Sequence, residues 1–315
     1  MRKVALVRAL LPLSALLSTP LLMTLLAGCG GDAPGAATAL PSFPQEDVVS
    51  PIQPDTTLAA QVPADVRKAG VLRAVSAMAV PPGSFYGSDN KTMLGMDIDI
   101  SGAAARVLGL RPERSVAAFE AILPGLDSGK YQVGTGNFGV TEVRKKTIDF
   151  ATYLSDGSGF AVRKDSKLGK VTDLTQLCGL KVGTGQGTTF EAELREQQPR
   201  CAQKGQPPYK IQVWKDAPTL LLALNQGRID AAMYTVNGLG YAIPSQQPNL
   251  KFLGEYDRLP VGFALKKGSP LAELLRDAVN KLIQDGTYAK ITKKWRVAGS
   301  AITKSEVSPP ENSLQ

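Results

Sequence analysis

The sequence contains no histidine and only three cysteines, and these two shortages remove much of enzyme chemistry. Protein zinc sites are built largely from cysteine and histidine ligands, and Ser-His-Asp triads and Cys-His nucleophiles both require an imidazole. None of these sites can be assembled here in its usual form. We therefore expect no metal, no cofactor and no catalytic residue, and we consider binding functions first.

A concentrated basic surface is also missing. The chain has 36 basic and 28 acidic residues, a formal charge of +8, but Arg2, Lys3 and Arg8 lie in an N-terminal segment with the features of a cleaved signal. Without them, 33 basic residues stand against 28 acidic ones, a charge of +5 that is spread along the chain with no basic-aromatic cluster. This distribution argues against nucleic-acid binding, which requires clustered positive charge.

Residues 1–28 have the order of a secretory signal, with a basic start, a long apolar run and small residues just before Cys29. The ending LAGC resembles the lipobox of bacterial lipoproteins, whose cysteine is lipidated and becomes the mature N-terminus. The alternative is an uncleaved anchor, since about 20 apolar residues span a membrane, although Pro12 and Pro20 interrupt this run. Both alternatives place the protein outside the cytoplasmic membrane, at the cell surface or in the periplasm.

Low-complexity segments lie on either side of the apolar-patterned part of the chain. Residues 29–63 are rich in Gly, Ala, Pro, Thr and Ser, which predicts a disordered tether attached to the lipidated Cys29. Residues 298–315 are polar and contain proline, so we expect a free tail. With Cys29 lipidated and the compartment oxidising, Cys178 and Cys201 are predicted to form a disulfide; the alternative is two buried thiols.

The part between these segments repeats one plan. In its first half a short apolar strand enters the loop MAVPPGSFYG, and FEAILPGLDSGKYQVGTGNF predicts a helix, a glycine stop and a strand. In its second half LKVGTGQG predicts a strand and a glycine loop, and PTLLLALNQGRIDAAMYTV again predicts helix, glycine and strand. Such alternation favours parallel α/β sheets, whose ligands bind beyond the carboxyl ends of the strands. We expect loops 137–141 and 234–238 to face one cleft; one continuous doubly wound sheet is the alternative.

Several segments together resemble, in order and spacing, the bacterial extracellular solute-binding proteins for polar amino acids, which are the capture components of ABC importers. These segments are VLRAVSAMAVPP, LGMDIDI, FEAILPGLDSGKY, TEVRKKTIDFATYLSDG, LKVGTGQGTTFE, GRIDAAMY and DGTYAKITKKW. The resemblance covers roughly residues 64–297 and is nearest to a Gram-positive lipoprotein branch of the family.

The resemblance implies an α/β, two-lobed periplasmic-binding-protein-like fold of type II, with a cleft between the lobes. Residues 64–164 and 264–297 would form the first lobe and residues 165–263 the second. Two crossover segments would join them, near residues 163–166 and 259–267. The final helix would return to the first lobe.

In that family the arginine of a T-x-x-R segment binds the α-carboxylate of the ligand, and Arg144 occupies the matching position. A guanidinium donates two parallel hydrogen bonds to a carboxylate and stays charged at every relevant pH. The alternative is a solvated face shared with Lys145 and Lys146. In the second lobe, GTGQGTTFE offers backbone N–H groups and a helix N-terminus, both of which favour an anion. We expect the residues Gly187, Thr188 and Thr189 to complete the carboxylate site.

Other site residues follow from the same resemblance. Phe119 matches a position that packs against the ligand, with ordinary core packing as the alternative, and Phe138 flanks the first exit loop. The matching count replaces the ammonium-binding aspartate by Thr235, and the following replacements occur in the first lobe: Ala77 and Val80 for an aspartate and an aromatic residue, Asn137 and Gly139 for Gly and Thr. We therefore expect a carboxylate whose amino group is absent, acylated or left in water, unless Asp216 or Glu255 reaches the cleft.

Taken together, these features predict a monomeric, lipid-anchored substrate-binding protein that captures a small carboxylate, an amino acid or a related organic acid, by lobe closure. Its partners would be this ligand, an ABC permease and the membrane that holds its anchor. Two alternatives are an enzyme on the same fold, of the cyclohexadienyl or arogenate dehydratase type, and a ligand-sensing subunit.

Overall fold

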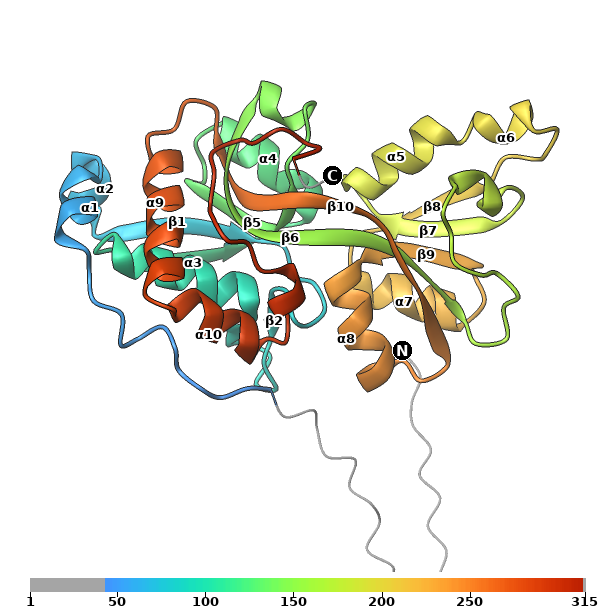
Figure 1. Cartoon of the computed structure of the whole chain (residues 1–315), viewed down its shortest axis with the longest axis horizontal. Helices are drawn as coiled ribbons and strands as arrows, with labels where there is room; N and C mark the ends of the chain where they lie inside the picture. Colours follow the sequence, from blue (N-terminus) through green and yellow to red (C-terminus); the bar gives the residue numbers. More distant parts are fainter. Residues whose placement is uncertain (1–42, 314–315) are drawn as a thin grey trace, which may run out of the picture. The chain divides into compact units, whose positions relative to one another are not determined.

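The computed structural model describes residues 43–313 of the chain (Figure 1). The signal segment, Cys29 and the first part of the tether lie outside the described residues, so the predictions made for them stay predictions. Among the helices of the described part, none is both long and apolar enough to cross a membrane.

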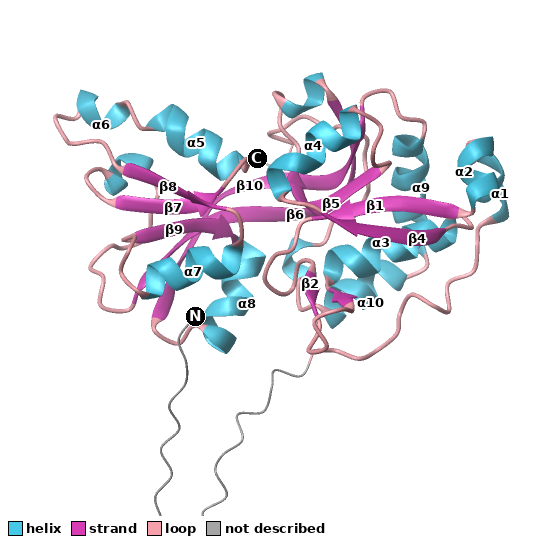
Figure 2. Cartoon of the chain, turned by 180° about the vertical axis from the view of Figure 1, so that it is seen from behind, coloured by secondary structure: helices cyan, strands magenta, loops and turns pink. Residues whose placement is uncertain are grey.

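An eight-stranded mixed sheet with helices on both faces makes up most of the described part, beside a small two-stranded sheet (Figure 2). The strands of the large sheet are β1 (Val71–Ser76), β4 (Arg111–Val116), β5 (Val133–Gly139), β6 (Ile148–Arg163), β7 (Lys181–Gly185), β8 (Lys210–Trp214), β9 (Ala231–Thr235) and β10 (Leu250–Lys266). The small sheet pairs β2 (Phe85–Tyr86) with β3 (Met93–Leu94). The α-helices are α1 (Thr56–Gln61), α2 (Ala64–Ala69), α3 (Met96–Val107), α4 (Phe119–Asp127), α5 (Thr189–Gln197), α6 (Arg200–Gln203), α7 (Ala217–Asn225), α8 (Val236–Gln246), α9 (Leu271–Gln284) and α10 (Thr287–Lys294); the 3-10 turns are η1 (Arg144–Lys146), η2 (Leu174–Leu177) and η3 (Ala298–Ser300).

The strand order is β4-β1-β5-β10-β6-β9-β7-β8, so the two halves of the chain occupy opposite ends of the sheet. In the first lobe β1 pairs in parallel with β4 and β5, and in the second lobe β7 pairs in parallel with β8 and β9. Only the long antiparallel strands β6 and β10 join the two sets (Figure 1). The predicted two-lobed α/β arrangement with two crossover segments is confirmed.

The change from one lobe to the other takes place inside these two long strands. β6 pairs with β9 of the second lobe over Ser158–Val162, and β10 pairs with β5 of the first lobe from Val261 to Ala264. The segments predicted as crossovers, residues 163–166 and 259–267, therefore correspond to the end of β6 and to the first-lobe part of β10. We propose lobe boundaries inside the strands, before Ser158 and before Val261.

Each lobe has helices on both faces of its strands. In the first lobe α9 buries a stripe that recurs at helical spacing, and this stripe packs with α3, α10 and the sheet in one large cluster. α4 covers the opposite face through Ile122 and Leu126. In the second lobe α7 and α8 pack on one face, and Leu194 of α5 packs with Phe160 on the other. Independent cores allow the lobes to keep their shapes if they move.

Both segments expected to be disordered are ordered in part. Within the expected tether, Val48 and Val62 are buried, and α1 forms between them with Asp55 as its N-cap. The expected free tail is wrong for residues 298–313. Here Ser305 is fully buried and Val307 forms an antiparallel bridge with Ala151 of β6.

The tail is ordered because hydrogen bonds that involve backbone groups hold it against β6. The Glu306 amide donates to Thr152 Oγ1 at 2.8 Å, and Ser305 Oγ donates to the Thr152 carbonyl. Lys145 Nζ also donates to the Pro309 carbonyl at 3.0 Å. Because such bonds do not depend on apolar side chains, a polar, proline-containing composition did not reveal them.

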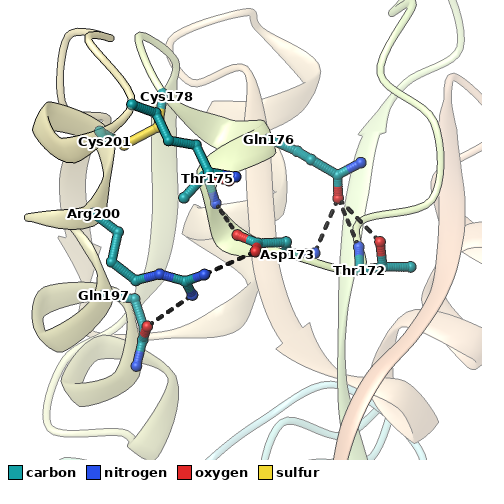
Figure 3. Close-up of polar contacts among 9 residues, drawn as sticks. Thr172, Asp173, Thr175, Gln176, Cys178, Gln197, Arg200 and Cys201 are labelled. Carbon is teal, nitrogen blue, oxygen red and sulfur yellow. Dashed lines mark hydrogen bonds and ion pairs between the residues drawn. A yellow bond between two sulfur atoms is a disulfide. The ribbon is translucent and has the colours of Figure 1, made fainter.

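Cys178 and Cys201 form the predicted disulfide, which ties the end of η2 to α6 (Figure 3). Polar contacts reinforce the same junction. Asp173 caps η2 by accepting from the Thr175 amide at 2.8 Å and pairs with Arg200 at 2.9 Å. The Gln176 side chain closes the turn by accepting from the Asp173 amide at 3.0 Å. The disulfide thus closes a loop within the second lobe alone.

We expect the double substitution Cys178→Ser and Cys201→Ser to lower the free energy of unfolding by about 3 kcal/mol, because the open chain gains loop entropy when unfolded. The loop spans a sequence separation of 23 residues. Urea unfolding of both proteins measures the effect, and wild-type protein with reductant serves as a control. Coinciding midpoints with and without reductant would contradict the expectation.

Candidate functional site

A cavity lies between the two lobes, beyond the carboxyl ends of parallel strands from both. Loops after β1 and β5 line it from the first lobe, and loops after β7 and β9 line it from the second. Its volume is about 90 Å³, several times the 10–15 Å³ that one water molecule needs on this scale. The cavity therefore suits a small molecule, and the expected meeting of the exit loops at one cleft is confirmed.

The structure brings most of the predicted site residues to this cavity. Those that line it are Val80, Phe119, Asn137, Arg144, Thr188, Thr189 and Thr235. Gly139 and Gly187 line a neighbouring groove on the other side of Arg144 instead. Phe138 is fully buried and stacks behind Phe119, with 4.6 Å between ring centroids, so it supports the cavity wall from behind.

Arg144 connects the lobes by hydrogen bonds to both. It begins η1, where its own amide donates to Thr141 Oγ1. Its Nη1 donates to the Gly139 carbonyl of the first lobe at 3.1 Å, and its Nη2 donates to the Gly187 carbonyl of the second at 3.2 Å. The guanidinium carbon also lies 5.8 Å from the centroid of the Phe119 ring.

The Arg144 guanidinium makes no ion pair with any carboxylate of the described residues. Burial lowers its pKa to about 10, which leaves it charged at neutral pH, and the more distant Glu311 opposes this shift. Arg144 is half-buried, and a charge that is partly withdrawn from water without a counter-ion is unfavourable. This position is therefore suited to receive an anion.

The start of α5 faces the same cavity with further donors. Thr188 caps the helix by accepting from the Glu191 amide at 3.2 Å, while the Glu191 side chain accepts from the Gly187 amide at 2.8 Å. The amides of Thr189 and Phe190 have no acceptor in the described part of the chain. They add to the positive end of the helix dipole.

Gly187 fits its position for two reasons. Its φ is +72°, in the left-handed region that favours glycine. A Cβ there would lie 2.9 Å from the Cβ of Glu120, which belongs to α4 of the first lobe. A side chain at residue 187 would thus hold the lobes apart.

Asp156, which the sequence analysis missed, joins the end of β5 in the first lobe to the start of α8 in the second, where β6 crosses between the lobes. Its Oδ2 accepts from Asn137 Nδ2 at 2.6 Å, and its Oδ1 accepts from the amides of Gly157 at 2.8 Å and Asn237 at 3.3 Å. Burial raises the pKa of Asp156 to about 7, although these bonds and Arg258 favour its charged form. The available signal was an acid within TYLSDGSGF, between the apolar residues Leu154 and Phe160.

Asp97 is a second missed acid. It is 1% exposed and accepts from the Tyr153 hydroxyl at 2.6 Å and from Ser84 Oγ at 3.4 Å. The Tyr153 hydroxyl in turn accepts from the Asn137 amide at 3.3 Å, where Asn137 has a φ of +61°. Burial raises the pKa of Asp97. The network fixes the loop that carries Asn137 into the cavity.

The two acids considered as counter-charges differ in position. Asp216 lines the cavity, and its Oδ1 accepts from the Thr219 amide at 2.8 Å as the N-cap of α7. Glu255 does not line the cavity and forms an ion pair with Arg258. Thr235 caps α8 by accepting from the Gly238 amide at 3.1 Å. Within residues 43–313, no group of three or more acidic or cysteine side chains is placed to hold a metal ion.

Two α/β lobes joined by two strands, with a half-buried cation and a helix N-terminus facing one cavity, define a two-lobed solute-binding protein. The pattern of the bacterial extracellular solute-binding proteins, family 3, matches residues 72–298, and the chain belongs to this family.

Similar proteins agree with this assignment. The arginine-binding protein ArgT of Corynebacterium glutamicum is 29% identical over 246 residues, which are 78% of this chain and 80% of that protein. The L-cystine-binding protein TcyJ of Escherichia coli is 29% identical over 242 residues, 76% of this chain and 86% of that protein. A solved ancestral arginine-binding protein bound to arginine is 31% identical, with a TM-score of 0.65, and covers 72% of this chain and 98% of its own.

We expect the free energy of unfolding to fall as pH rises from about 5 to 8. The folded state keeps protons on Asp156, with a pKa of about 7, that the unfolded chain has already lost. The stabilising contribution of Asp156 is thus present when it is protonated and disappears as pH rises through its folded pKa. Each such group contributes a slope of at most roughly 1.4 kcal/mol per pH unit.

Urea titrations across this pH range measure the slope. Asp156→Asn mimics the protonated group and should make the dependence shallower. A residual slope should remain from Glu193, whose pKa burial raises to about 7, and from Asp97, whose pKa burial also raises. Equal slopes in the wild type and in Asp156→Asn would show that Asp156 does not titrate in this window.

Proposed function

We propose that the protein captures a small carboxylate between its lobes and delivers it to an ABC permease, while a lipid on Cys29 holds it at the outer side of the membrane. The observation that carries this proposal is Arg144, a half-buried and charged guanidinium that has no carboxylate partner in the described part of the chain and lies beside the open amides of α5. Family membership and relatives that bind arginine and cystine support a transport role.

The contacts of Arg144 also suggest how binding is coupled to lobe movement. In the structure its two terminal nitrogens bond neutral carbonyls, one in each lobe. A carboxylate in the cavity would offer Arg144 a charged acceptor and would reach the amides of Thr189 and Phe190 at the same time. One ligand then bonds both lobes, which favours the closed arrangement over an open one.

The cavity offers little compensation for a free ammonium group. Thr235 brings a hydroxyl to the place of the family's aspartate, and Asp97 and Asp156 already accept two and three hydrogen bonds. We therefore favour a carboxylate whose amino group is absent, acylated or left in water. Ordinary polar amino acids are the alternative, and Asp216 would be their counter-charge, because its Oδ2 makes no hydrogen bond in the described part.

The enzyme alternative has a structural relative. A solved ancestral amino acid-binding protein, itself described as a precursor of cyclohexadienyl dehydratase, is 27% identical with a TM-score of 0.65 and covers 76% of this chain and 99% of its own. Dehydration requires an acid that protonates a leaving group. Asp97 and Asp156 are engaged with partners of the chain itself, which supports binding without chemistry. Product formation from arogenate-like substrates would favour the enzyme instead.

We expect Arg144→Ala to lower the affinity for the carboxylate by about 2 to 5 kcal/mol, because a charge-assisted pair in a closed cleft is lost. Isothermal titration calorimetry measures the change. Lys146→Ala is the matched control, since Lys146 is a neighbouring cation that is exposed to solvent. If both variants bind with near wild-type affinity, Arg144 does not bind the ligand.

A thermal-shift screen identifies the ligand class. We expect stabilisation by N-acylated amino acids, keto acids or aromatic acids rather than by free amino acids, with a gain of about 2.7 kcal/mol at 100 times the dissociation constant. Tight binding of a free α-amino acid that is lost on N-acetylation would contradict the favoured ligand class and would point to Asp216.

A further inference from the structure

The C-terminal tail contacts the short segment that carries Arg144. Arg144 begins η1, a 3-10 turn of three residues between β5 and β6. A turn of this length makes few hydrogen bonds of its own. The tail, dark red in Figure 1, pairs with the edge of β6 and continues to this turn, where Glu311 and Arg144 line the same groove. The turn therefore receives part of its support from the tail.

Two residues that flank Arg144 in the sequence bond the tail. The Glu142 amide donates to Glu311 Oε2 at 2.7 Å, and the Glu311 amide donates back to Glu142 Oε1 at 3.3 Å. Lys145 Nζ donates to the Pro309 carbonyl at 3.0 Å and also pairs with Glu142 Oε1 at 2.7 Å. The backbone on both sides of Arg144 is thus tied to the tail.

The two lysines of the turn differ in their surroundings. Lys145 bonds the tail, and its side chain is 17% exposed. Lys146, the next residue, is exposed to solvent. Because an ammonium group that leaves water needs acceptors, the burial of Lys145 depends on those that the tail and Glu142 supply. The two lysines therefore carry the same charge but differ in the tail contact.

The direction of the Arg144 side chain decides what its guanidinium can bind. Its Nη1 and Nη2 donate to the carbonyls of Gly139 and Gly187, one in each lobe. Because the guanidinium is a planar fork, it forms two parallel bonds to a carboxylate only when the fork faces the ligand. A turn that is already fixed leaves less freedom for binding to remove, so a held Arg144 binds more tightly.

We propose that Glu142, Lys145 and Glu311 are positioning residues, through which the C-terminal tail holds Arg144 in place for the carboxylate of the ligand. They act through Arg144 rather than by contact with the ligand. This inference rests on the proposed function, because it requires a carboxylate at Arg144, and it deepens that function by making the tail part of the binding site.

The charge of Glu311 would have the opposite effect on binding. The Glu311 carboxylate is near enough to Arg144 to raise the pKa of the guanidinium against the effect of burial. The same negative charge repels an incoming carboxylate. Glu311→Gln removes this charge but keeps an oxygen that can accept from the Glu142 amide, whereas Glu311→Ala removes both. The two variants therefore separate positioning from charge.

Isothermal titration measures the effect on binding. The probes are N-acetylleucine, 4-methyl-2-oxopentanoate and leucine, which share a side chain suited to the apolar residues Val80, Phe119 and Leu220 of the cavity. For the probe that the wild type binds most tightly, we expect Glu311→Ala to weaken the affinity about tenfold, near the value of one hydrogen bond to a charged group. Glu311→Gln should bind this probe as tightly as the wild type or more tightly.

Lys145→Ala tests the second contact and should also weaken binding about tenfold. Two controls remove the same charges without removing a contact between the turn and the tail. Lys146→Ala removes a cation from the neighbouring exposed position, and Glu306→Ala removes a tail acid that pairs with the exposed Lys304. Both controls should keep the affinity of the wild type.

Hydrogen exchange followed by mass spectrometry reports on the turn without any ligand. In Glu311→Ala, peptides that cover residues 141–147 should exchange about tenfold faster than in the wild type, because the turn opens more often. Glu311→Gln should restore the wild-type rate, and peptides from β5 should exchange equally in all variants. A residue that acted only through its charge would leave the exchange of the turn unchanged.

Three outcomes would overturn the inference: wild-type affinity in both Glu311→Ala and Lys145→Ala, equal weakening in Glu311→Gln and Glu311→Ala, or unchanged exchange of residues 141–147 in Glu311→Ala. Arg144→Ala separates such a failure from failure of the proposed function. If Arg144→Ala abolishes binding of the probe while the tail variants change nothing, only the role of the tail is wrong. Binding that persists in Arg144→Ala, or a wild type that binds none of the probes, would instead overturn both.

Discussion

The antiparallel pairing of β6 with β10 is the interaction on which the rest of the structure depends. It runs the length of both strands and is the only strand pairing that links the two parallel sets in the described part of the chain. Each set has its own helices and its own core, and one first-lobe residue, Val80, is buried in the second-lobe cluster. The cavity exists because the two parallel strand sets are joined side by side within one sheet, and the carboxyl ends of strands from both sets lead to it.

The groups at this junction are polar and buried, which gives the cleft its chemistry. Asp156 sits on β6 and accepts from Asn137 of one lobe and from the Asn237 amide of the other. Arg144 bonds a carbonyl in each lobe. A charge or donor at such a contact raises the free energy of the folded protein when it lacks a partner, because it cannot hydrogen-bond to water in a site that excludes solvent. The free energy of the closed cleft therefore depends on which groups a ligand brings into it.

Much of this arrangement could be predicted from short patterns. Helical and strand periodicity, glycine stops and the order of the segments indicated the two lobes. The role predicted for Arg144 came from the family resemblance, and Thr188 came from a glycine loop that precedes a helix. These signals are local in the sequence, so the chain displays them directly. The disulfide followed from the expected compartment and from the absence of other partners for Cys178 and Cys201.

The residues that were missed depend on long-range contacts. The strand that carries TYLSDGSGF is buried nearly throughout, so no alternation of exposed and buried residues marks its crossing point or the position of Asp156. The role of Asp97 arises from Tyr153, and that of Asp156 from the Asn237 amide, and both partners are far away in the sequence. The Gly187–Glu120 approach likewise appears only when the lobes meet.

The ordered C-terminal tail has a consequence for how the molecules behave towards one another. Between residues 148 and 157, β6 pairs with β10 on one side only, and within residues 43–313 the tail covers the other side through Val307 and Glu306. An uncovered strand edge is a template for pairing with a second molecule, which leads to aggregation. The tail therefore covers this strand edge, and an affinity tag fused directly after the tail would interfere with its pairing to β6.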